Sequence, residues 1–289
     1  MGLESVKEIL GHSVKHRYGV AAFNVYNYES VLWAVSAAES EGMPVIIQFY
    51  PGYTVHISLK AVAEIVKDIA SRAAVPVGLH LDHARDYETA LEGIKAGFGS
   101  VMIDGSLLPF DGNVRLTADV ARAAKAFGVD VEAELGHVGS GGKVEDFTNP
   151  HNYTDPTEVK RFLELTGADS LAVSIGNGHG HYVQSPVRDF ERINAIRAET
   201  DAPLVLHGGS EIPDAQIVEA VVRGMNKFNI ATEYGCALYG AMKEAVGRSE
   251  QGKGSFFGVL NSMKADAEAY VRAKIKLLNP GGQVGLWSM

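Results

Sequence analysis

Three histidines occur where a fold could bring them together as metal ligands. They are His83 in GLHLDHARD, His179 in SIGNGHGHY and His207 in LVLHGGSE, and each accompanies a short apolar run. Three imidazoles that leave a fourth coordination position open are the donor set of a catalytic zinc site. A single histidine of this kind is more often a hydrogen-bonded residue without metal, so the zinc prediction depends on one fold gathering all three.

Carboxylates accompany these histidines. Asp82 precedes His83, so we expect its side chain beside the metal, where it could exchange a proton with a bound substrate. Its alternative role is to orient a histidine ligand. Asp104 and Glu134 end two neighbouring apolar runs, and either could serve a second metal position or pair with a nearby Lys or Arg.

Two segments are suited to bind phosphate. Residues 207–210 (HGGS) and 229–232 (NIAT) follow apolar runs, and glycine lets backbone N–H groups approach an anion closely. In α/β barrels, phosphate commonly binds after the seventh and eighth strands. The turn at 176–180 (GNGHG) adds a third flexible segment near His179. These segments predict a phosphorylated ligand.

Apolar runs and helical patterns alternate along the chain, and these elements must position the polar residues. The expected strands are 20–25, 45–49, 75–81, 100–103, 129–135, 170–175, 203–206 and 227–230. The expected helices, with apolar residues at i, i+3 and i+4, are 30–41, 59–72, 87–96, 113–127, 156–166, 187–199, 214–223 and 233–246. Strands too apolar to have a solvent-exposed face predict a parallel sheet covered by helices.

A (β/α)8 TIM barrel is the simplest closed arrangement of these elements, and a doubly wound open sheet is the alternative. In a barrel the catalytic residues lie at the carboxyl ends of the strands. Polar side chains end every expected strand: Asn24, Gln48, Asp82–His83, Asp104, Glu134, His179, His207 and Asn229. An open sheet would concentrate such residues at one switch point, so we predict an α/β fold of the TIM-barrel type.

The barrel is expected to be a single domain over residues 1–289. Its C-terminal extension, about 252–289, holds one more helix near 260–278. The stretch 139–155, which begins with GSGG, is expected to be a mobile loop because such a composition does not pack.

Composition narrows the classes of partner. Lys and Arg number 26 against 35 Asp and Glu, and this net charge of −9 argues against nucleic acid as a partner. No apolar run approaches the ~18 residues of a membrane span, and the first residues lack a signal-peptide pattern, so we expect no membrane partner and a cytoplasmic location. Cys236 is the only cysteine, which leaves His, Asp and Glu as possible metal ligands.

Together these segments resemble the class II, metal-dependent ketose-bisphosphate aldolases of the fructose- and tagatose-bisphosphate type. The matching stretches are AFNVYN (22–27), HLDH (80–83), SVMIDGS (100–106), VEAELG (131–136), SLAVSIGNGHG (170–180), LVLHGGS (204–210) and KFNIAT (227–232). The resemblance implies reversible cleavage of a ketose 1-phosphate or 1,6-bisphosphate to dihydroxyacetone phosphate and an aldehyde, through a zinc-stabilised enediolate. It also implies a homodimer or homotetramer that acts in carbohydrate metabolism.

The resemblance assigns roles to individual residues. His83, His179 and His207 would bind Zn²⁺, and Glu134 and Asp104 would serve the inner rim, where a second cation can bind. Asp82 would be the acid/base at the C4 oxygen, and Glu145 would move the enediolate proton. The substrate and its phosphate would contact Asn24, Gln48, Tyr50, Gly180, Gly208, Gly209, Ser210, Asn229, Ala231 and Thr232.

The chemistry of the residues agrees with a metal-dependent route. Breaking a C–C bond beside a carbonyl needs an electron sink, which is either a lysine imine or a metal ion. No expected strand ends in lysine, and Lys227 begins the eighth strand, at the wrong end of the barrel. A metal is therefore expected to act as the Lewis acid.

Three departures from the family pattern bear on the substrate. Tyr50, in QFYPG, stands where a small hydroxyl residue is usual near the aldehyde half, and Glu211 replaces a glycine after HGGS. The C-terminal region lacks the Asp-Pro-Arg segment whose arginine binds the distal phosphate in the family. The aldehyde is therefore predicted not to be plain glyceraldehyde 3-phosphate, unless Lys253, Lys264 or Arg272 replaces that arginine.

Two other functions stay open. A barrel metallohydrolase or epimerase would use the same histidines and aspartate to activate water or move a proton. Such enzymes usually have a ligand pair such as His-x-His on strand one, where this chain has Asn24-Val25-Tyr26. A non-catalytic sugar-phosphate sensor on the same scaffold would be expected to have lost metal ligands that this chain retains.

Overall fold

Short apolar and β-branched segments form a closed barrel of parallel strands in the computed structural model, which describes residues 2–184, 188–249, 255–282 and 287. The barrel strands are β1 (Val20–Asn24), β2 (Val45–Phe49), β3 (Val77–Ala84), β4 (Ser100–Ile103), β5 (Asp130–Leu135), β7 (Ser170–Val173), β9 (Leu204–Leu206) and β10 (Met225–Ile230). They pair in the order β1-β10-β9-β7-β5-β4-β3-β2, and β1 closes the ring by pairing with β2. The predicted TIM barrel is confirmed, and the open sheet is wrong.

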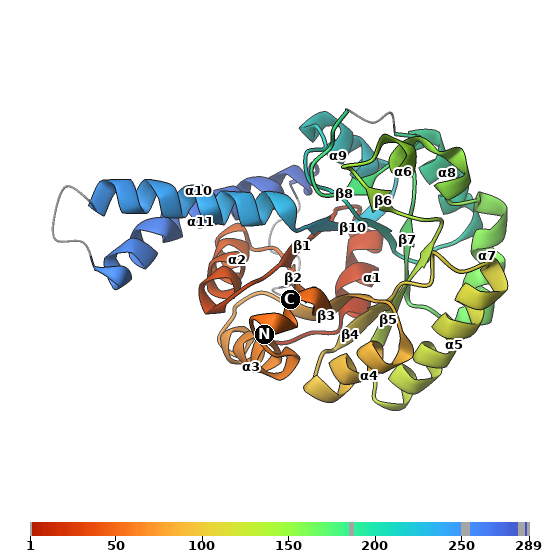
Figure 1. Cartoon of the computed structure of the whole chain (residues 1–289), viewed down its shortest axis with the longest axis horizontal. Helices are drawn as coiled ribbons and strands as arrows, with labels where there is room; N and C mark the ends of the chain where they lie inside the picture. The colour runs from red at the N-terminus through yellow and green to blue at the C-terminus, as the bar shows by residue number, and fades with distance from the viewer. Residues whose placement is uncertain (1, 185–187, 250–254, 283–286, 288–289) are drawn as a thin grey trace.

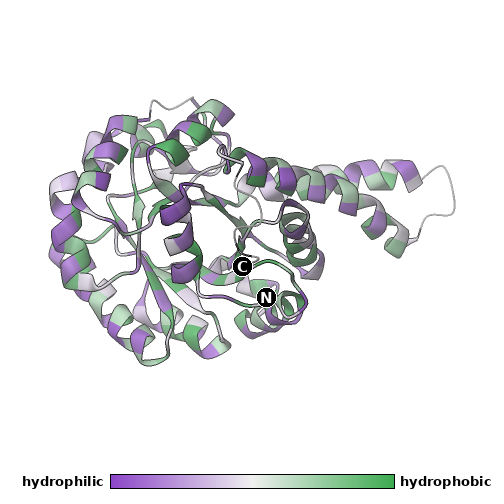
Figure 2. Ribbon diagram, turned by 180° about the vertical axis from the view of Figure 1, so that it is seen from behind, coloured by the Kyte–Doolittle hydropathy of each residue, from purple (hydrophilic) through white to green (hydrophobic). Residues whose placement is uncertain are grey.

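Helices follow the strands and surround the barrel (Figure 1). They are α2 (Tyr28–Glu41), α3 (Leu59–Ala70), α4 (Tyr87–Ala96), α5 (Phe110–Ala126), α7 (Pro156–Thr166), α8 (Phe190–Glu199), α9 (Asp214–Val222) and α10 (Thr232–Ser249). Their apolar residues face inward, as Val62, Val66 and Ile69 of α3 do. Figure 2 shows mainly hydrophobic strands inside a ring of helices in which hydrophilic and hydrophobic residues alternate.

The amino-terminal helix α1 (Val6–His16) was not predicted from the sequence. Its apolar residues Val6, Ile9 and Leu10 are buried, and it contacts β1, β3 and β10. The side chains of Val6 and Ile9 approach Gly78 of β3. A Cβ at residue 78 would lie 2.9 Å from a methyl group of Val6. Helix α1 therefore packs its apolar face against the core of the barrel.

Most other predicted elements occur within three or four residues of their expected bounds. Strand β3 continues to Ala84 instead of ending at residue 81, and α5 begins at Phe110 instead of residue 113. The helix expected over 187–199 is Phe190–Glu199, and residue 187 lies outside the described residues. The difference matters most at β3, because the residues beyond its expected end include Asp82 and His83 of the candidate site.

The segment 139–155 was expected to be a loop that does not pack, and this prediction is wrong. It contains β6 (Gly139–Ser140), the short helix α6 (Val144–Thr148) and the 3-10 turn η2 (Pro150–Asn152). Strand β6 pairs in parallel with β8 (Gly178–His179), and Phe147 is buried. The two small strands tie the connections that follow β5 and β7 to each other.

The C-terminal region forms an arm that projects from the barrel (Figure 1). Helix α10 packs antiparallel to α11 (Phe256–Leu277), and α11 also contacts α2. A separate small core holds the arm to the barrel: Trp33, Ala241, Ala245, Met263 and Ala267. Helix α11 starts at Phe256 rather than at the expected residue 260.

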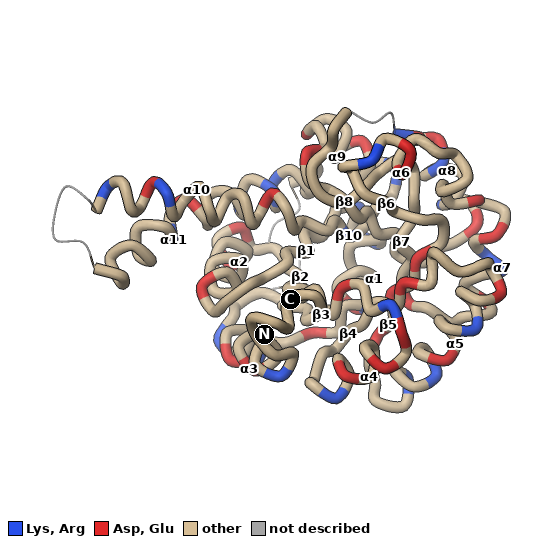
Figure 3. Tube along the Cα trace, viewed as in Figure 1, with Lys and Arg blue, Asp and Glu red and all other residues tan. Residues whose placement is uncertain are grey.

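Charged residues of both signs are interspersed over the outer helices (Figure 3). Among the described residues, no helix combines the length and apolar character that crossing a bilayer requires.

Candidate active site

The carboxyl ends of the barrel strands surround a cavity of about 370 Å³. This volume is in the range of small-molecule sites. Most residues predicted for the site line the cavity: Asn24, Tyr50, Asp82, His83, Asp104, His179, Gly180, His207, Gly208, Ser210, Asn229, Ala231 and Thr232. Four others do not line it: Gln48, Glu134, Glu145 and Gly209.

Strand β3 presents Asp82 and His83 to the same cavity although they are consecutive residues. Consecutive side chains of a regular strand point to opposite faces. Here the pairing of β3 with β4 shifts register between Leu81 and Ala84, and His83 has a left-handed backbone φ of 48°. Such an irregularity redirects side chains, and it is what brings the carboxylate and the imidazole together.

The three predicted histidines form one cluster. His83 Nε2 lies 2.8 Å from His207 Nδ1. His179 lies in β8 rather than at the end of a barrel strand, and its ring centroid is 4.8 Å from that of His83 and 5.7 Å from that of His207. One nitrogen from each ring lies within 4.8 Å of the others, a spacing that suits a shared cation.

Carboxylates hold the outer nitrogen atoms of two of these rings. His83 Nδ1 lies 3.2 Å from Asp104 Oδ2, and His207 Nε2 lies 2.8 Å from Glu132 Oε1. A metal-ligating histidine typically donates its second N–H to such a carboxylate, which selects its tautomer and orientation. His83 Nε2 and His207 Nδ1 are then the nitrogens directed toward a metal, and the donor set fits zinc.

The surroundings of the rings also suit ligation. Burial, reinforced by His83, lowers the pKa of His179 and of His207 well below the ordinary value, so both rings are neutral as ligands must be. Burial by itself lowers the pKa of His83, but the carboxylates of Asp82 and Asp104 raise it to about 9. A proton on His83 and a bound cation are therefore alternative ways to balance these carboxylates.

Asp104, Glu134 and His83 form a second group that could hold a cation, with one ligand atom from each within 4.8 Å of the others. Glu134 Oε1 accepts a hydrogen bond from the Val138 N–H at 2.9 Å. Its Oε2 is buried and has no hydrogen-bond partner among the described residues. Burial and the charge of Asp104 raise the pKa of Glu134 to about 8, as expected of a carboxylate short of compensating charge.

Two amide groups hold the carboxylate of Asp82. Asn24 Nδ2 donates to Oδ2 at 2.9 Å, and Asn229 Nδ2 donates to Oδ1 at 3.2 Å. Gln48 lies behind Asn24 and donates to its Oδ1 at 2.6 Å. Burial raises the pKa of Asp82, but His83, His207, Lys227 and the Asn24 amide outweigh it and the net shift is downward, so the group is ionised and able to accept a proton.

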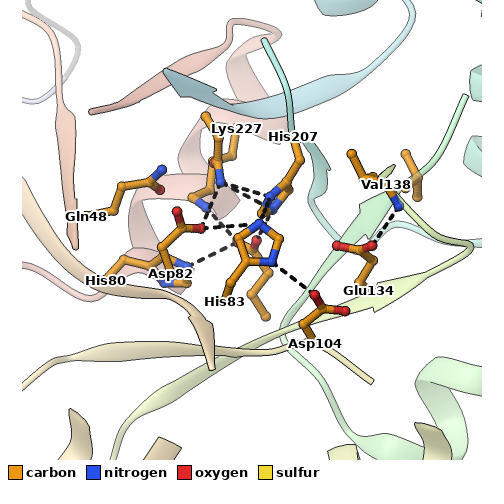
Figure 4. Close-up of polar contacts among 12 residues, drawn as sticks. Gln48, His80, Asp82, His83, Asp104, Glu134, Val138, His207 and Lys227 are labelled. Carbon is orange, nitrogen blue, oxygen red and sulfur yellow. Dashed lines mark hydrogen bonds and ion pairs between the residues drawn. The ribbon is translucent and has the colours of Figure 1, made fainter. Parts of the chain in front are cut away.

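A buried ion pair of Lys227, which Figure 4 shows near His207, supports the cluster from inside the barrel. Lys227 Nζ lies 2.8 Å from Glu132 Oε2, and neither side chain is exposed to solvent. Lys227 lies near the amino end of β10, as expected. Its side chain nevertheless reaches Glu132, which contacts His207. Because its ammonium group is paired with Glu132, it is not a free amine for imine chemistry.

The segments predicted to bind phosphate lie beside each other. Gly208 has a φ of 61°, and a Cβ there would lie 2.1 Å from the carbonyl oxygen of Gly178, so only glycine permits this approach. Ser210 Oγ accepts a hydrogen bond from the Glu233 N–H at 3.2 Å, and Thr232 is the first residue of the 18-residue helix α10. The first N–H groups of a helix lack intrahelical partners and attract anions.

Seven residues that the sequence analysis did not single out also line the cavity: Tyr53, Arg85, His137, Val138, Gly139, Ser140 and Asp146. Five of them belong to the segment after β5, which packs over the cavity instead of forming a free loop. Asp146 faces the cavity, and the Glu145 side chain is exposed on α6. Adjacent acidic residues give no sequence signal of which one faces inward.

The departures from the family pattern have structural consequences. Tyr50 lines the cavity and contacts Tyr53 edge to face, with ring centroids 5.4 Å apart. The carboxylate of Glu211 pairs with His181 and accepts the Tyr182 N–H at 3.0 Å, so its charge is partnered away from the phosphate segments.

Of the three residues proposed to replace the missing arginine, the two that the structure describes are not at the site. Lys264 and Arg272 lie on α11 and do not line the cavity, and Lys264 pairs with Glu268. Lys253 lies outside the described residues.

The chain is similar to known aldolases in sequence and in structure. The family model described as "Fructose-bisphosphate aldolase class-II" matches residues 4–283. The structure is similar to the YdjI aldolase from Escherichia coli K12, with 34% identity, a TM-score of 0.85, and coverage of 96% of this chain and 97% of that one. The fold is also similar to fructose-bisphosphate aldolase from Campylobacter jejuni, with 24% identity, a TM-score of 0.81, and coverage of 96% of each chain.

Fold and site together define a TIM-barrel lyase of the aldolase class. The chain belongs to the class II fructose-bisphosphate aldolase family. The family resemblance predicted from the sequence is confirmed, and membership favours an aldolase over the hydrolase, epimerase and sensor alternatives.

Proposed function

We propose that the protein is a zinc-dependent aldolase that cleaves a ketose 1-phosphate or 1,6-bisphosphate to dihydroxyacetone phosphate and an aldehyde. The observation that carries the proposal is the cluster of His83, His179 and His207 beside an ionised Asp82 in one cavity. A zinc ion, when bound by the three histidines, supplies the electron sink that C–C cleavage next to a carbonyl requires. Asp104 and Glu134 are proposed to hold a second cation.

Asp82 is proposed as the base in the cleavage direction. It removes the proton from the C4 hydroxyl, the C3–C4 bond breaks, and C4 becomes the carbonyl carbon of the aldehyde. The electron pair of the broken bond remains on the three-carbon fragment, which takes up a proton at C3 to give dihydroxyacetone phosphate. Because Asn24 and Asn229 hold both oxygens of Asp82, the carboxylate is oriented before the substrate arrives.

The proton at C3 is proposed to come from the segment after β5. Glu145 is the residue expected from the family pattern, but its side chain is exposed on α6 and must move to reach the cavity. Asp146 already lines the cavity and is the second candidate. Its Oδ2 accepts the Ser140 N–H at 3.1 Å, which ties this acid to β6 beside His179.

The phosphate of the dihydroxyacetone half is proposed to bind where the segments after β9 and β10 meet. Gly208, Gly209, Ser210, Ala231 and Thr232 are proposed to supply backbone N–H groups and hydroxyls there, and Gly180, which follows β8, is proposed to contribute as well. The aldehyde half is proposed to lie toward Tyr50, while Gln48, which does not line the cavity, acts through its hydrogen bond to Asn24. The substrate is proposed to be either of the fructose- or tagatose-bisphosphate type, or one whose aldehyde half lacks a distal phosphate. A cytoplasmic location stays a prediction.

We also propose that the protein is a homodimer or homotetramer that associates through the α10–α11 arm. Tyr239, Met242 and Val246 form an exposed apolar stripe at i, i+3 and i+7 of α10. Phe256 and Phe257 of α11 are 81% and 72% exposed. Large apolar side chains gathered on a projecting element are typical of an interface.

A metal-removal experiment tests the proposed activity. Dihydroxyacetone phosphate release is measured by a coupled assay on ketose 1-phosphates and 1,6-bisphosphates, before and after dialysis against a chelator. We expect release to fall at least about 100-fold on metal removal and to return when zinc is added back, because the Lewis acid is lost. Release that survives complete metal removal would contradict the zinc mechanism. No release from any ketose by zinc-loaded protein would contradict the aldolase proposal.

A further inference from the structure

Arg85 occupies an unusual position in the cavity. It follows directly after β3 and lines the cavity with its side chain exposed. Within the described ranges, no other lysine or arginine lines this cavity. Arg85 also makes no hydrogen bond or ion pair with a described residue. Its guanidinium group is therefore available to a ligand.

The strand order places Arg85 across the barrel from the phosphate segments. In the ring β1-β10-β9-β7-β5-β4-β3-β2, three strands separate β3 from β9 in either direction, so the two strands are diametrically opposite. Gly208 and Ser210 follow β9. The histidine cluster lies between, because His83 comes from β3 and His207 follows β9. A substrate with its phosphate at the β9 side directs its other end toward Arg85.

The position of Arg85 matters because the cavity is otherwise lined by several carboxylates. Asp82, Asp104 and Asp146 line the cavity as well, so a second anionic group on the substrate enters a region rich in carboxylates. Asp86, next to Arg85, is engaged as the cap of α4, where its Oδ1 accepts the Thr89 N–H at 2.7 Å. A guanidinium group binds carboxylate or phosphate with two parallel hydrogen bonds, which makes it suited to compensate such a group.

We propose that Arg85 binds an anionic group, either a carboxylate or a phosphate, at the distal end of the aldehyde half of the substrate. The proposal rests on the proposed aldolase function. Arg85 thereby supplies the distal anion contact that neither Lys264 nor Arg272 provides from α11. It makes the enzyme selective for acidic aldehydes over neutral ones of the same length.

The test measures kcat/KM in the synthesis direction with dihydroxyacetone phosphate and two matched pairs of aldehydes. One pair is glyceraldehyde 3-phosphate and glyceraldehyde, and the other is succinic semialdehyde and 4-hydroxybutanal. The wild type is expected to prefer the acidic member of at least one pair. Arg85→Gln should lower that acidic-to-neutral ratio roughly 10- to 100-fold, because hydrogen bonds to a charged group are lost. Arg85→Lys should give an intermediate ratio.

The two aldehyde pairs distinguish phosphate from carboxylate as the distal group. Arg115→Gln is the matched control, because Arg115 is an exposed arginine on α5 that does not line the cavity. An equal ratio for Arg85→Gln and wild type would overturn the proposal, and so would a wild type with no preference in either pair. If glyceraldehyde and every other aldehyde fail with the zinc-loaded wild type, the proposed function itself is overturned.

Discussion

At the scale of residues, hydrogen bonds decide which atoms face the reacting groups. Asp104 and Glu132 each bond to the outer nitrogen of a histidine, and the inner nitrogens of His83 and His207 then face each other. The amides around Asp82 work in the same way, since both carboxylate oxygens are held by donors. The cluster is thus prepared for ligation and proton transfer by partners that touch no substrate.

Replacing Asp82 with asparagine tests its proposed role as the base. Asp82→Asn keeps the size of the side chain but removes the proton acceptor, so kcat should fall about 10²- to 10⁴-fold. Metal content should stay near that of the wild type, because the histidines carry the ligation. The measurement is coupled dihydroxyacetone phosphate release together with elemental analysis of the protein.

Asp111→Asn serves as the control, since Asp111 is an exposed carboxylate in the first turn of α5. An Asp82→Asn enzyme that retains more than about a tenth of wild-type kcat would show that another group accepts the proton.

The buried Lys227–Glu132 pair should be required for folding stability. Lys227→Met removes one partner and leaves the other charge buried, which typically costs about 3–5 kcal/mol in the free energy of unfolding. Urea unfolding monitored by circular dichroism measures this value. The double variant Lys227→Met with Glu132→Gln should recover part of the loss, because it removes the uncompensated charge. A single variant as stable as the wild type would contradict the importance of the pair.

At the scale of elements, connections between strands complete the site. Strands β6 and β8 pair with each other outside the barrel, and this pairing carries His179 and the segment with Asp146. Glu233, near the start of α10, connects three elements. Its Oε1 accepts the Glu211 N–H at 2.7 Å, and its Oε2 contacts Lys274 Nζ at 2.6 Å and accepts the Tyr270 O–H at 2.8 Å.

Glu233 should make stability depend on pH. Burial by itself raises its pKa, but Lys274, the Glu211 N–H and Tyr270 lower it below the ordinary value of 4.5. A carboxyl whose pKa is lower in the folded state stabilises the fold above pH about 4.5 and loses this contribution as pH falls through the folded value. Glu233→Gln should therefore cost about 1.5–3 kcal/mol at pH 7, and the difference should shrink toward pH 4.

The measurement for Glu233 is urea unfolding of both proteins at pH 7, 5 and 4. Glu244→Gln is a suitable control, because Glu244 is exposed on the same helix. A Glu233 effect that stays constant from pH 7 to pH 4 would contradict the assigned ionisation.

At the scale of the whole molecule, barrel and arm have different tasks. The barrel holds the reacting groups at one end. The arm projects from the barrel (Figure 1) and carries exposed apolar residues. The arm has a small core of its own around Trp33, and Val271 and Ile275 of α11 belong to the main core. Phe256 and Phe257 at the tip of the arm are exposed and belong to neither core, so changes there leave the barrel packing intact.

Replacing the apolar tip should weaken association. The double variant Phe256→Ser and Phe257→Ser removes two largely exposed rings, and it should shift the protein from the proposed oligomer toward a monomer at micromolar concentration. Sedimentation velocity measures the change. Phe127→Ser is the control, because Phe127 is 70% exposed at the end of α5 on the barrel. A wild type that sediments as a monomer would contradict the proposed assembly.

The sequence by itself determined the barrel and most of the cavity lining. Parallel strands buried on both faces need apolar runs, and the polar residues that end those runs must then meet at one rim. The histidine cluster, Asp82 and the phosphate segments followed from this local pattern. Their agreement with the family motifs made the class of reaction predictable as well.

Only the tertiary structure decided how these residues face one another. The register shift in β3 turns Asp82 and His83 to one side, which strict alternation along a strand would not allow. The pairing of β6 with β8 packs a segment whose composition indicated a free loop, and it turns Asp146 rather than Glu145 toward the cavity. The position of Arg85 opposite β9 depends on ring closure. Each of these features arises from contacts between segments far apart in the chain, and local propensity carries no information about such contacts.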